Sequence, residues 1–478
     1  MNTTNSLPKK IGIWSATSIA IGSIIGSGVF MKPASMAAEL GSPVWLAIVW
    51  VVAGLLSLFG ALIYAELGAM LPETGGIYAY FKYMFGEFFA FLFGWAAFAV
   101  INTAAVAAIG FICAQYANYF LHLPRFDVAI EQSYTLHIPF IGDLHPLENM
   151  GVKVLAIFLV ILFSFLNYRS LKAGSYFQVL STIVKIAVIG LLIIGIFSSN
   201  NGSVQNFWHA ENPKHGADLL SGFVIAMTGA FFAFDGWINV NYIAGEIKDP
   251  QRNIPRSLVA GVLACIVVYL LVNQAYLYAL PVEKVASSSL VASDAINVAM
   301  GQTGSAIVAA LIVICTLGAM NGNIMATCRI TYAMGKDKIF LPFVGKLHPR
   351  FQTPGNAVWL HAAWTSLLIF SGSFDMLADM FVFITWIAYG AGAIGIFLLR
   401  KRMPDKPRPY KMWGYPVVPV IFIAFTFFYL VLTVYNDTVN YLSGKQPVIN
   451  SLLGLLITLI GIPFYFYYRK REPAIVNR

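Results

Sequence analysis

Long apolar segments alternate with short polar ones along the whole chain of 478 residues. Most apolar segments have roughly 20 residues, the length that a helix needs to cross the hydrocarbon core of a bilayer. The first is too long and too rich in glycine for a cleaved signal peptide. The pattern predicts twelve membrane-spanning helices, at 11–39, 43–70, 86–120, 150–168, 176–198, 217–247, 256–280, 303–330, 354–371, 375–400, 415–436 and 448–468.

Small and polar residues interrupt the first predicted span near its middle, between Gly22 and Gly28. Glycine is a poor helix former, and non-helical backbone inside a bilayer persists only where it lines a cavity or is buried in protein. The run from Ile25 to Gly28 therefore predicts a break between two half-helices. The free amides of the second half-helix would attract a carboxylate. Alternatively, Gly22 and Gly26 pack against a neighbouring helix.

The sixth predicted span has a similar interruption between Phe231 and Asn239, with an acid and a glycine at its centre. An ionisable side chain within a membrane span is costly and is usually functional. Two roles are open for Asp235. It either caps the second half-helix by accepting bonds from free N–H groups, or contacts a substrate directly.

Interruptions in the first and sixth spans lie at matching positions of two five-helix halves, which indicates an inverted repeat with a binding site near the midplane. The predicted units are a cytoplasmic N-terminal tail, a first repeat (helices 1–5), a second repeat (helices 6–10), two further helices and a cytoplasmic C-terminal tail. Their limits are 1–10, 11–200, 201–401, 402–470 and 471–478.

Composition and charge restrict the class of protein. Hydrophobic residues make up 59% of the chain and charged residues 11%, which excludes an ordinary soluble domain. The formal net charge is +9. Nearly all Lys and Arg residues outside the spans lie in connecting segments on the same side as both termini. The other side carries only Arg125, Lys153, Lys214, Lys284 and Lys445.

This charge asymmetry predicts the orientation, because loops rich in Lys and Arg stay in the cytoplasm. Both termini are therefore expected in the cytoplasm, and the chain is expected to be a multi-pass protein of the cell inner (plasma) membrane. The basic excess reflects this topology and the anionic inner leaflet of the lipid bilayer, so no nucleic acid partner is expected.

Metal, cofactor and enzyme chemistry have little support in the sequence. The histidines of the longest outer loop, His122, His137 and His145, match no metal-ligand spacing, so no metal site or cofactor is expected. The spans contain no nucleophile or metal motif of a membrane enzyme. The four cysteines lie in apolar segments and are expected to be buried thiols. They are Cys113, Cys265, Cys315 and Cys328.

Lys185 lies inside the fifth predicted span. An ammonium group there must face a partner or a cavity, unless its long side chain reaches the membrane interface.

Four segments make the chain similar to the transporters of the amino acid–polyamine–organocation superfamily, and within it to the L-type amino acid transporter branch, bacterial members included. The resemblance covers nearly the whole chain, and the first and last segments together are highly specific. They are Gly22–Phe30 (GSIIGSGVF), Leu71–Tyr78 (LPETGGIY), Phe232–Trp237 (FAFDGW) and Glu246–Ser257 (EIKDPQRNIPRS).

The resemblance implies an all-α polytopic membrane protein with twelve transmembrane helices and a LeuT-type 5+5 inverted repeat, in which helices 1 and 6 are broken. It also implies that the substrate carboxylate binds the amides around Ser27 and Gly28, and that free carbonyl groups beside both breaks hold the α-amino group. An aromatic ring at Phe234, or at Phe231 or Trp237, would close the site as a gate. The implied substrate-binding residues are Ile24, Ile25, Gly26, Ser27, Gly28, Phe231, Ala233, Phe234, Asp235 and Gly236.

The resemblance also gives Lys185 a role, because sodium-independent members have a lysine at this place in the fifth span. Its ammonium would replace a bound sodium ion between spans one and eight, or would carry a proton. Residues Ser305 and 316–323 are candidate partners in span eight.

The function expected from these observations is sodium-independent transport of neutral L-amino acids by alternating access, as an exchanger and not as an enzyme. Proton-coupled amino acid symport and amine or polyamine antiport remain alternatives. The partners expected are the amino acid substrate and the bilayer. Because the outer loops contain no cysteine, no disulfide-linked heavy chain is expected.

Overall fold

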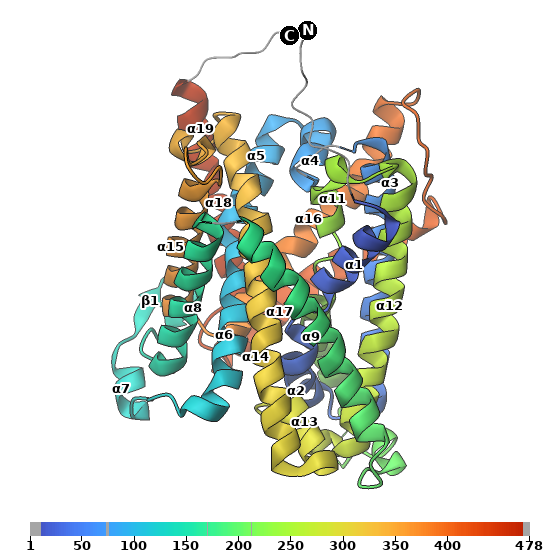
Figure 1. Cartoon of the computed structure of the whole chain (residues 1–478), viewed down its shortest axis with the longest axis vertical. Coiled ribbons are helices and arrows are strands. Elements are labelled where there is room, and N and C mark those ends of the chain that lie inside the picture. Colours follow the sequence, from blue (N-terminus) through green and yellow to red (C-terminus); the bar gives the residue numbers. More distant parts are fainter. Residues whose placement is uncertain (1–10, 73–75, 170, 212, 472–478) are drawn as a thin grey trace.

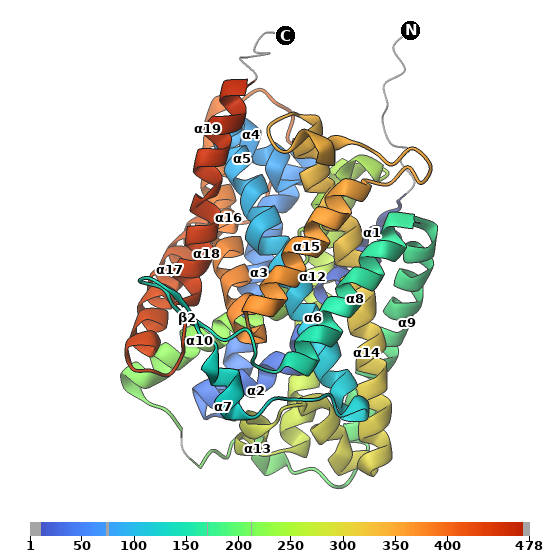
Figure 2. The same ribbon diagram turned by 90° about the vertical axis from the view of Figure 1, so that its left-hand side faces the viewer.

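The computed structural model describes residues 11–72, 76–169, 171–211 and 213–471 and is a bundle of long helices (Figure 1, Figure 2). Ten helices in this part of the chain are long and apolar enough to cross a membrane. They are α3 (Pro43–Met70), α5–η1–α6 (Glu87–Ala96, Ala97–Asn102, Thr103–Leu121), α8 (Met150–Arg169), α9 (Leu171–Phe197), α10 (Gly216–Phe234), α12 (Pro250–Ala279), α14 (Val291–Lys336), α16 (Phe374–Arg402), α17 (Val417–Leu442) and α18–α19 (Asn450–Leu459, Gly461–Arg471).

The first predicted span is a bent pair of helices, α1 (Ile13–Ile24) and α2 (Gly28–Leu40), which brings the count of candidate spans to as many as eleven. The ninth predicted span corresponds to α15 (Gly355–Ser371), which has 17 residues. This length is at the lower limit for crossing a bilayer. The predicted total of twelve spans stays a prediction.

Short elements connect the long helices. At one end of the bundle lie α7 (Val128–Ser133) and α13 (Val282–Ser287), and we call this end, predicted to face outward, the outer end (Figure 1). The antiparallel strands β1 (Leu136–Ile138) and β2 (Gly142–Leu144) belong to the same outer loop as α7. The remaining short elements are η2 (Val204–Phe207), α4 (Ile77–Phe85), α11 (Asn239–Tyr242), η3 (Ala244–Glu246) and η4 (Pro342–Gly345).

Two differences from the predicted spans have local causes. The predicted sixth span continues to residue 247 as a second half-helix, but after its break the structure has only the four-residue α11 and the 3₁₀ turn η3. In α14, Gly301 has a φ of +65°, which interrupts the helix. The predicted eighth span, 303–330, is the part of α14 that follows this interruption.

Helix α16 is fixed to its neighbours near both ends. Ser373 caps its outer end by accepting a hydrogen bond from the Met376 amide. Near its other end, Arg400 makes a bidentate ion pair with the buried carboxylate of Glu66 on α3, at 2.6 and 2.9 Å. A bidentate pair fixes the relative orientation of the two helices.

Other predictions concern the cysteines and the tails. All four cysteines are buried free thiols, so the prediction of buried thiols is confirmed. The predicted tails, 1–10 and 471–478, lie outside the described residues apart from Arg471, as do residues 73–75 of the second motif.

Candidate functional site

The first predicted break is present between α1 and α2, which are bent by 41° relative to each other. Because α1 ends at Ile24 and α2 begins at Gly28, the break consists of Ile25, Gly26 and Ser27. Ser27 is buried at the N-cap position, and its side chain makes no capping hydrogen bond. The Phe30 amide donates to the carbonyl oxygen of Ser27 at 3.1 Å. The amides of Gly28 and Val29, at the start of α2, remain as helix N-terminal donors for an anion, which the helix dipole also favours.

The second predicted break follows the end of α10 at Phe234. Gly236 has a φ of +106°, a backbone conformation that residues other than glycine rarely adopt. The chain returns to helix only at Asn239, where α11 begins. Asp235, Gly236, Trp237 and Ile238 therefore form this break.

The two breaks lie against each other through their glycines. A Cβ atom at Gly28 would lie 2.6 Å from the Cα atom of Ala233, and one at Gly236 would lie 2.5 Å from the carbonyl oxygen of Ser23. Both distances are far below van der Waals contact. Glycine at these two positions allows the backbones of the two breaks to touch. This contact brings together the residues predicted to bind substrate.

A tyrosine of α12 joins the two breaks. The buried hydroxyl of Tyr269 lies 2.7 Å from the carbonyl oxygen of Ile24 and 2.9 Å from that of Ala233. A hydroxyl has one hydrogen, so it donates to only one of these oxygens at a time. The other oxygen keeps an acceptor for a ligand, and an ammonium group with three donors matches such an arrangement.

The carboxylate of Asp235 has a different partner from the one that the capping role requires. Its Oδ1 accepts a hydrogen bond of 2.7 Å from the hydroxyl of Tyr389 on α16. The N-cap residue of α11 is Ile238, without a side-chain capping bond. Asp235 thus connects the second break to α16 and does not cap α11.

A small cavity of about 30 Å³ lies beside the second break, and Asp235 is part of its wall. This volume is far smaller than the roughly 300 to 1,000 Å³ of a typical small-molecule pocket, so the walls lie close together. Polar side chains from five elements, η1, the second break, α11, α14 and α16, line it. Those most relevant to ligand binding are Asn102, Asp235, Asn323, Thr327, Thr385 and Tyr389. We call this space the inner cavity.

Two polar atoms in this wall, Nδ2 of Asn102 and Oγ1 of Thr385, are buried without a hydrogen-bond partner in the described part of the chain. An unpaired buried polar atom costs free energy, so both atoms favour a ligand that pairs with them. Asn102 ends the π-helix η1, and π-helical turns often occur at functional sites.

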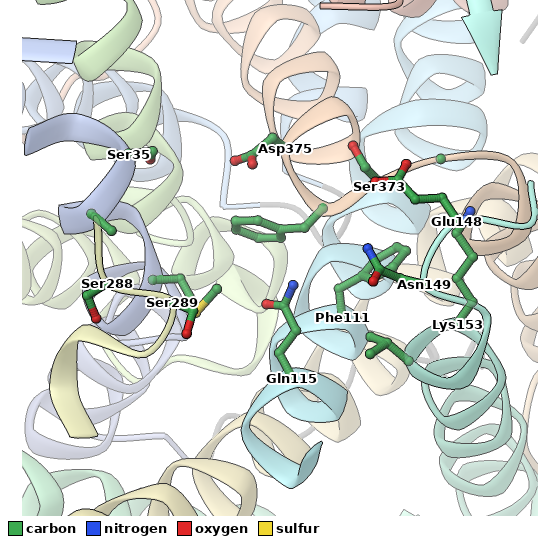
Figure 3. A pocket seen from close by; sticks show the side chains of 15 residues that line it. Ser35, Phe111, Gln115, Glu148, Asn149, Lys153, Ser288, Ser289, Ser373 and Asp375 are labelled. Carbon is green, nitrogen blue, oxygen red and sulfur yellow. The ribbon is translucent and has the colours of Figure 1, made fainter. Parts of the chain in front are cut away.

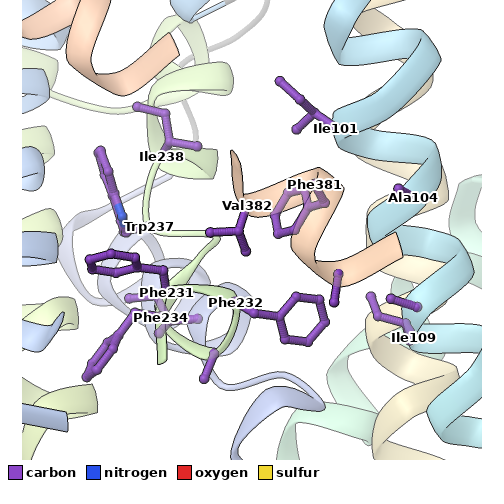
Figure 4. Close-up of a cluster of buried hydrophobic side chains, with 14 of the residues drawn as sticks. Ile101, Ala104, Ile109, Phe231, Phe232, Phe234, Trp237, Ile238, Phe381 and Val382 are labelled. Carbon is purple, nitrogen blue, oxygen red and sulfur yellow. The ribbon is translucent and has the colours of Figure 1, made fainter. Parts of the chain in front are cut away.

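The aromatic residues in the last turn of α10 and in the second break point in two directions (Figure 4). Phe234, the expected gate, is buried between Trp50 and Tyr269, with ring centroids at 5.9 and 5.0 Å. The alternatives also pack against other rings. The ring centroid of Phe231 lies 3.7 Å from that of Trp386, and the ring centroid of Trp237 lies 4.7 Å from that of Tyr389.

Phe232 points the opposite way, toward α16 (Figure 4). Its ring makes edge contacts with Phe374 at 5.8 Å and with Phe381 at 5.9 Å. Phe381 lines the inner cavity, whereas Phe374 lines a larger cavity at the outer end. These three rings therefore form an aromatic barrier between the two cavities.

Lys185 is buried, and its ammonium donates a 3.0 Å hydrogen bond to the carbonyl oxygen of Gly22 on α1. One turn earlier on α9, Ser181 packs so closely against α14 that a Cβ atom at Gly318 would collide with its hydroxyl. Lys185 thus lies where α1, α9 and α14 meet. Of the candidates in span eight, Ser305 donates to Ser293 and is engaged within α14.

Sequence reasoning missed three residues that the structure brings to the site: Tyr269, Phe232 as a barrier, and Asn102. A tyrosine, a phenylalanine or an asparagine in an apolar helix gives no periodic signal that tells which neighbour it faces. The polar side chain of Asn102 within the third predicted span was the one available signal. Among the described residues, no group of three or more His, Cys, Asp or Glu side chains is placed to hold a metal ion.

Comparison of the sequence with known proteins identifies its family and several relatives. The profile of the family described as amino acid permease matches residues 11–462. The serine/threonine exchanger SteT of Bacillus subtilis (strain 168) is 31% identical over 475 residues, which cover 98% of this chain and 99% of that protein. The human b(0,+)-type amino acid transporter 1 is 29% identical over 472 residues, 97% of this chain and 89% of that protein.

A third relative, the human cystine/glutamate transporter, is 27% identical over 463 residues, 97% of this chain and 85% of that protein. These proteins are transporters and not enzymes. Since the family profile matches nearly the whole chain, the protein belongs to the amino acid permease family of multi-pass membrane transporters.

Proposed function

We propose that the protein is a sodium-independent exchanger of neutral L-amino acids that works by alternating access. The observation that carries this proposal is the contact between the two breaks, bridged by the hydroxyl of Tyr269. Backbone donors at the start of α2 and backbone acceptors beside both breaks together match the two ends of an amino acid zwitterion.

The α-carboxylate binds the amides around Ser27 and Gly28, where α2 begins. The α-ammonium binds the carbonyl oxygens of Ile24 and Ala233, which already lie within hydrogen-bonding distance of one hydroxyl. Because this recognition uses main-chain atoms, it is common to all α-amino acids and leaves selectivity to the walls around the substrate side chain.

The substrate side chain extends into the inner cavity, where the unpaired atoms of Asn102 and Thr385 lie. Such walls favour a small polar side chain, because a hydroxyl group can donate to one of these groups and accept from the other. We therefore propose L-serine and L-threonine as the first substrates to test. The serine/threonine exchanger of Bacillus subtilis, 31% identical, supports this choice.

Sodium independence rests on Lys185. Its ammonium supplies a fixed positive charge beside the carbonyl oxygen of Gly22, in the segment that leads to the first break. A bound sodium ion needs oxygen ligands of this kind, so the lysine would take the place of the ion and stabilise the break without a coupling ion.

The proposed architecture is based on the positions of the two breaks. Breaks in the first helices of two repeats, 11–200 and 201–401, correspond to a LeuT-type 5+5 arrangement with twelve spans, in which α15 is the ninth. The last two spans lie in 402–470. The asymmetry of Lys and Arg supports cytoplasmic tails at 1–10 and 471–478.

Uptake by proteoliposomes tests the function. Vesicles are loaded with unlabelled L-serine or left empty, and uptake of radiolabelled L-serine, L-threonine, L-leucine and putrescine is followed in sodium-free buffer, with and without a pH gradient. Exchange predicts serine uptake that needs internal serine and ignores sodium and pH. Uptake into empty vesicles driven by the pH gradient would indicate proton symport, and uptake of putrescine alone would indicate amine transport.

A further inference from the structure

A groove of about 320 Å³ lies on the flank of the bundle near its outer end, where α3 and α12 pack side by side (Figure 1). The loop that contains η2 completes its wall. None of the described residues in this wall is ionisable, and none of them belongs to the site proposed above. We call this space the lateral groove.

The floor of the lateral groove is one face of α3. Its residues recur every three or four positions, the spacing that places side chains in one stripe along a helix. The stripe is about 12 Å long at 1.5 Å per residue, close to half of the hydrocarbon thickness of about 30 Å in a bilayer. The floor residues are Val44, Ala47, Ile48, Val51 and Val52.

The lateral groove is continuous with the surface that faces the bilayer. One turn beyond the floor on α3, Leu55 is exposed, and so are Leu271 and Val267 on α12. Because the chain is a multi-pass membrane protein, these apolar side chains contact lipid. Water needs several polar partners to occupy a cavity, so the apolar floor favours hydrocarbon as the occupant.

Polar groups lie only at the outer end of the groove. Trp50 on α3 contacts Tyr269 on α12, with ring centroids 5.4 Å apart. Gln274 lies about one and a half turns beyond Tyr269, level with the first turns of α3. Trp208, which is 75% exposed, lines the same end. In the part of the chain that the structure describes, the side chains of Gln274 and Trp208 have no hydrogen-bond partner.

The loop that carries Trp208 is fixed to the outer end of α12. The carbonyl oxygen of Tyr278 accepts hydrogen bonds from the amide of Ser203 at 2.9 Å and from the side-chain amide of Asn206 at 3.3 Å. Tyr278 is one turn beyond Gln274 on the same helix. The two N–H donors at the end of the groove are therefore held on one support.

We propose that the lateral groove binds one glycerophospholipid of the adjacent leaflet. An acyl chain lies along the floor, and an ester or phosphate oxygen accepts hydrogen bonds from Gln274 and Trp208. Because bulk lipid tails are as apolar as the groove, close packing and these hydrogen bonds give the preference for the groove. The inference needs the membrane location alone and is independent of the transported substrate.

The bound lipid also packs against the helix that supports the central site. Trp50 lies on the opposite face of α3 from the floor, and its ring contacts those of Phe234 and Tyr269. The lipid thus stabilises the pair of helices that positions the hydroxyl bridging the two breaks.

Photolabelling tests the site. The protein is reconstituted in phosphatidylcholine liposomes that contain a small share of phosphatidylcholine with a diazirine in one acyl chain, and labelled residues are mapped by mass spectrometry after irradiation. The variants are Ala47→Phe, which fills the groove, and Gln274→Leu, which removes a donor at similar size. The matched controls are Leu263→Phe, at an exposed position of α12, and Gln205→Leu, in η2; neither lines the groove.

We expect the groove floor to be labelled about tenfold more than Val267, an effect of two hydrogen bonds. Ala47→Phe should lower labelling of the floor about tenfold, and Gln274→Leu about fivefold. Both controls should stay within about twofold of the wild type. Phosphatidylcholine added to the purified protein in detergent should raise the Tm of the wild type and the controls more than that of the two groove variants.

Two results overturn the inference. One is equal labelling of the floor and of Val267 that does not change in Gln274→Leu, which would show that the groove holds bulk lipid without preference. The other is cross-linking between two protein chains at the groove in place of lipid adducts, which would show that a second copy covers it. If Ala47→Phe does not fold, Gln274→Leu and its control decide alone.

Discussion

At the residue scale, the site depends on two glycines that allow the breaks to touch. Gly28 faces Ala233 at the end of α10, and Gly236 faces the carbonyl oxygen of Ser23 at the end of α1, at distances that leave no room for a Cβ atom. The glycine-rich pattern of the first span is sufficient to predict this break. The contact partner is not predictable, because Ala233 is about two hundred residues further along the chain and looks like any other apolar residue.

Replacement of Gly28 by alanine tests this contact. The new methyl group must displace Ala233, so the breaks separate and serine uptake should fall at least about tenfold. Gly190→Ala is a matched control, because a Cβ atom there meets nothing within 4 Å and uptake should stay within about twofold of the wild type. Uptake in reconstituted vesicles gives the result, with size-exclusion chromatography as the check of folding. Equal uptake by both variants would argue against the contact.

The outer loop contains a carboxylate whose protonation affects local stability. Arg125 donates hydrogen bonds to the buried side chain of Glu131 at 2.8 to 3.1 Å, and this lowers the pKa of Glu131 from its usual value. A lowered pKa in the folded state gives stability that is present above the unfolded pKa, about 4.3, and is lost as the pH falls through the folded value.

Hydrogen exchange of the loop amides around α7 should therefore become faster as the pH is lowered from 6 through the lowered pKa of Glu131, after correction for intrinsic exchange rates. The variant Glu131→Gln should lose most of this pH dependence and exchange rapidly at pH 6. Identical protection profiles in the variant and the wild type would contradict the assigned ion pair.

At the element scale, the sequence predicts the half-helices of the first span better than those of the sixth span. The first break lies between two half-helices, as its pattern predicts, and these have 12 and 13 residues. The second half of the sixth span is much shorter than predicted. Hydropathy measures how apolar a segment is, but it does not show which tertiary contacts the segment makes. One such contact is the hydrogen bond from the side-chain amide of Asn241 to the carbonyl oxygen of Tyr64 on α3.

Lys185 connects two helices, because its ammonium on α9 donates a hydrogen bond to the α1 segment that precedes the first break. Lys185→Gln keeps a donor but removes the charge, so serine uptake should fall at least about tenfold while the protein stays folded. Lys284→Gln, at an exposed position of α13, should keep normal uptake. Normal activity in Lys185→Gln would show that the fixed charge is unnecessary.

At the scale of the whole molecule, the structure has a cavity of about 330 Å³ at its outer end (Figure 3) and a much smaller inner cavity of about 30 Å³, separated by the aromatic barrier. The apolar pattern is enough to predict a polytopic bundle and most of its helices. The walls of both cavities depend on side chains from helices far apart in sequence. Asp375, Gln115 and Glu148, for example, meet only in the folded chain.

The central claim is that the two breaks bind one amino acid together, with Tyr269 between them. The most direct measurement is equilibrium binding of L-serine to the purified protein in sodium-free buffer, for the wild type and Tyr269→Phe. Tyr119→Phe, at an exposed ring, is the control. The account predicts that Tyr269→Phe weakens binding at least about tenfold and that the control does not. Equal affinity of Tyr269→Phe and the wild type for serine would contradict it.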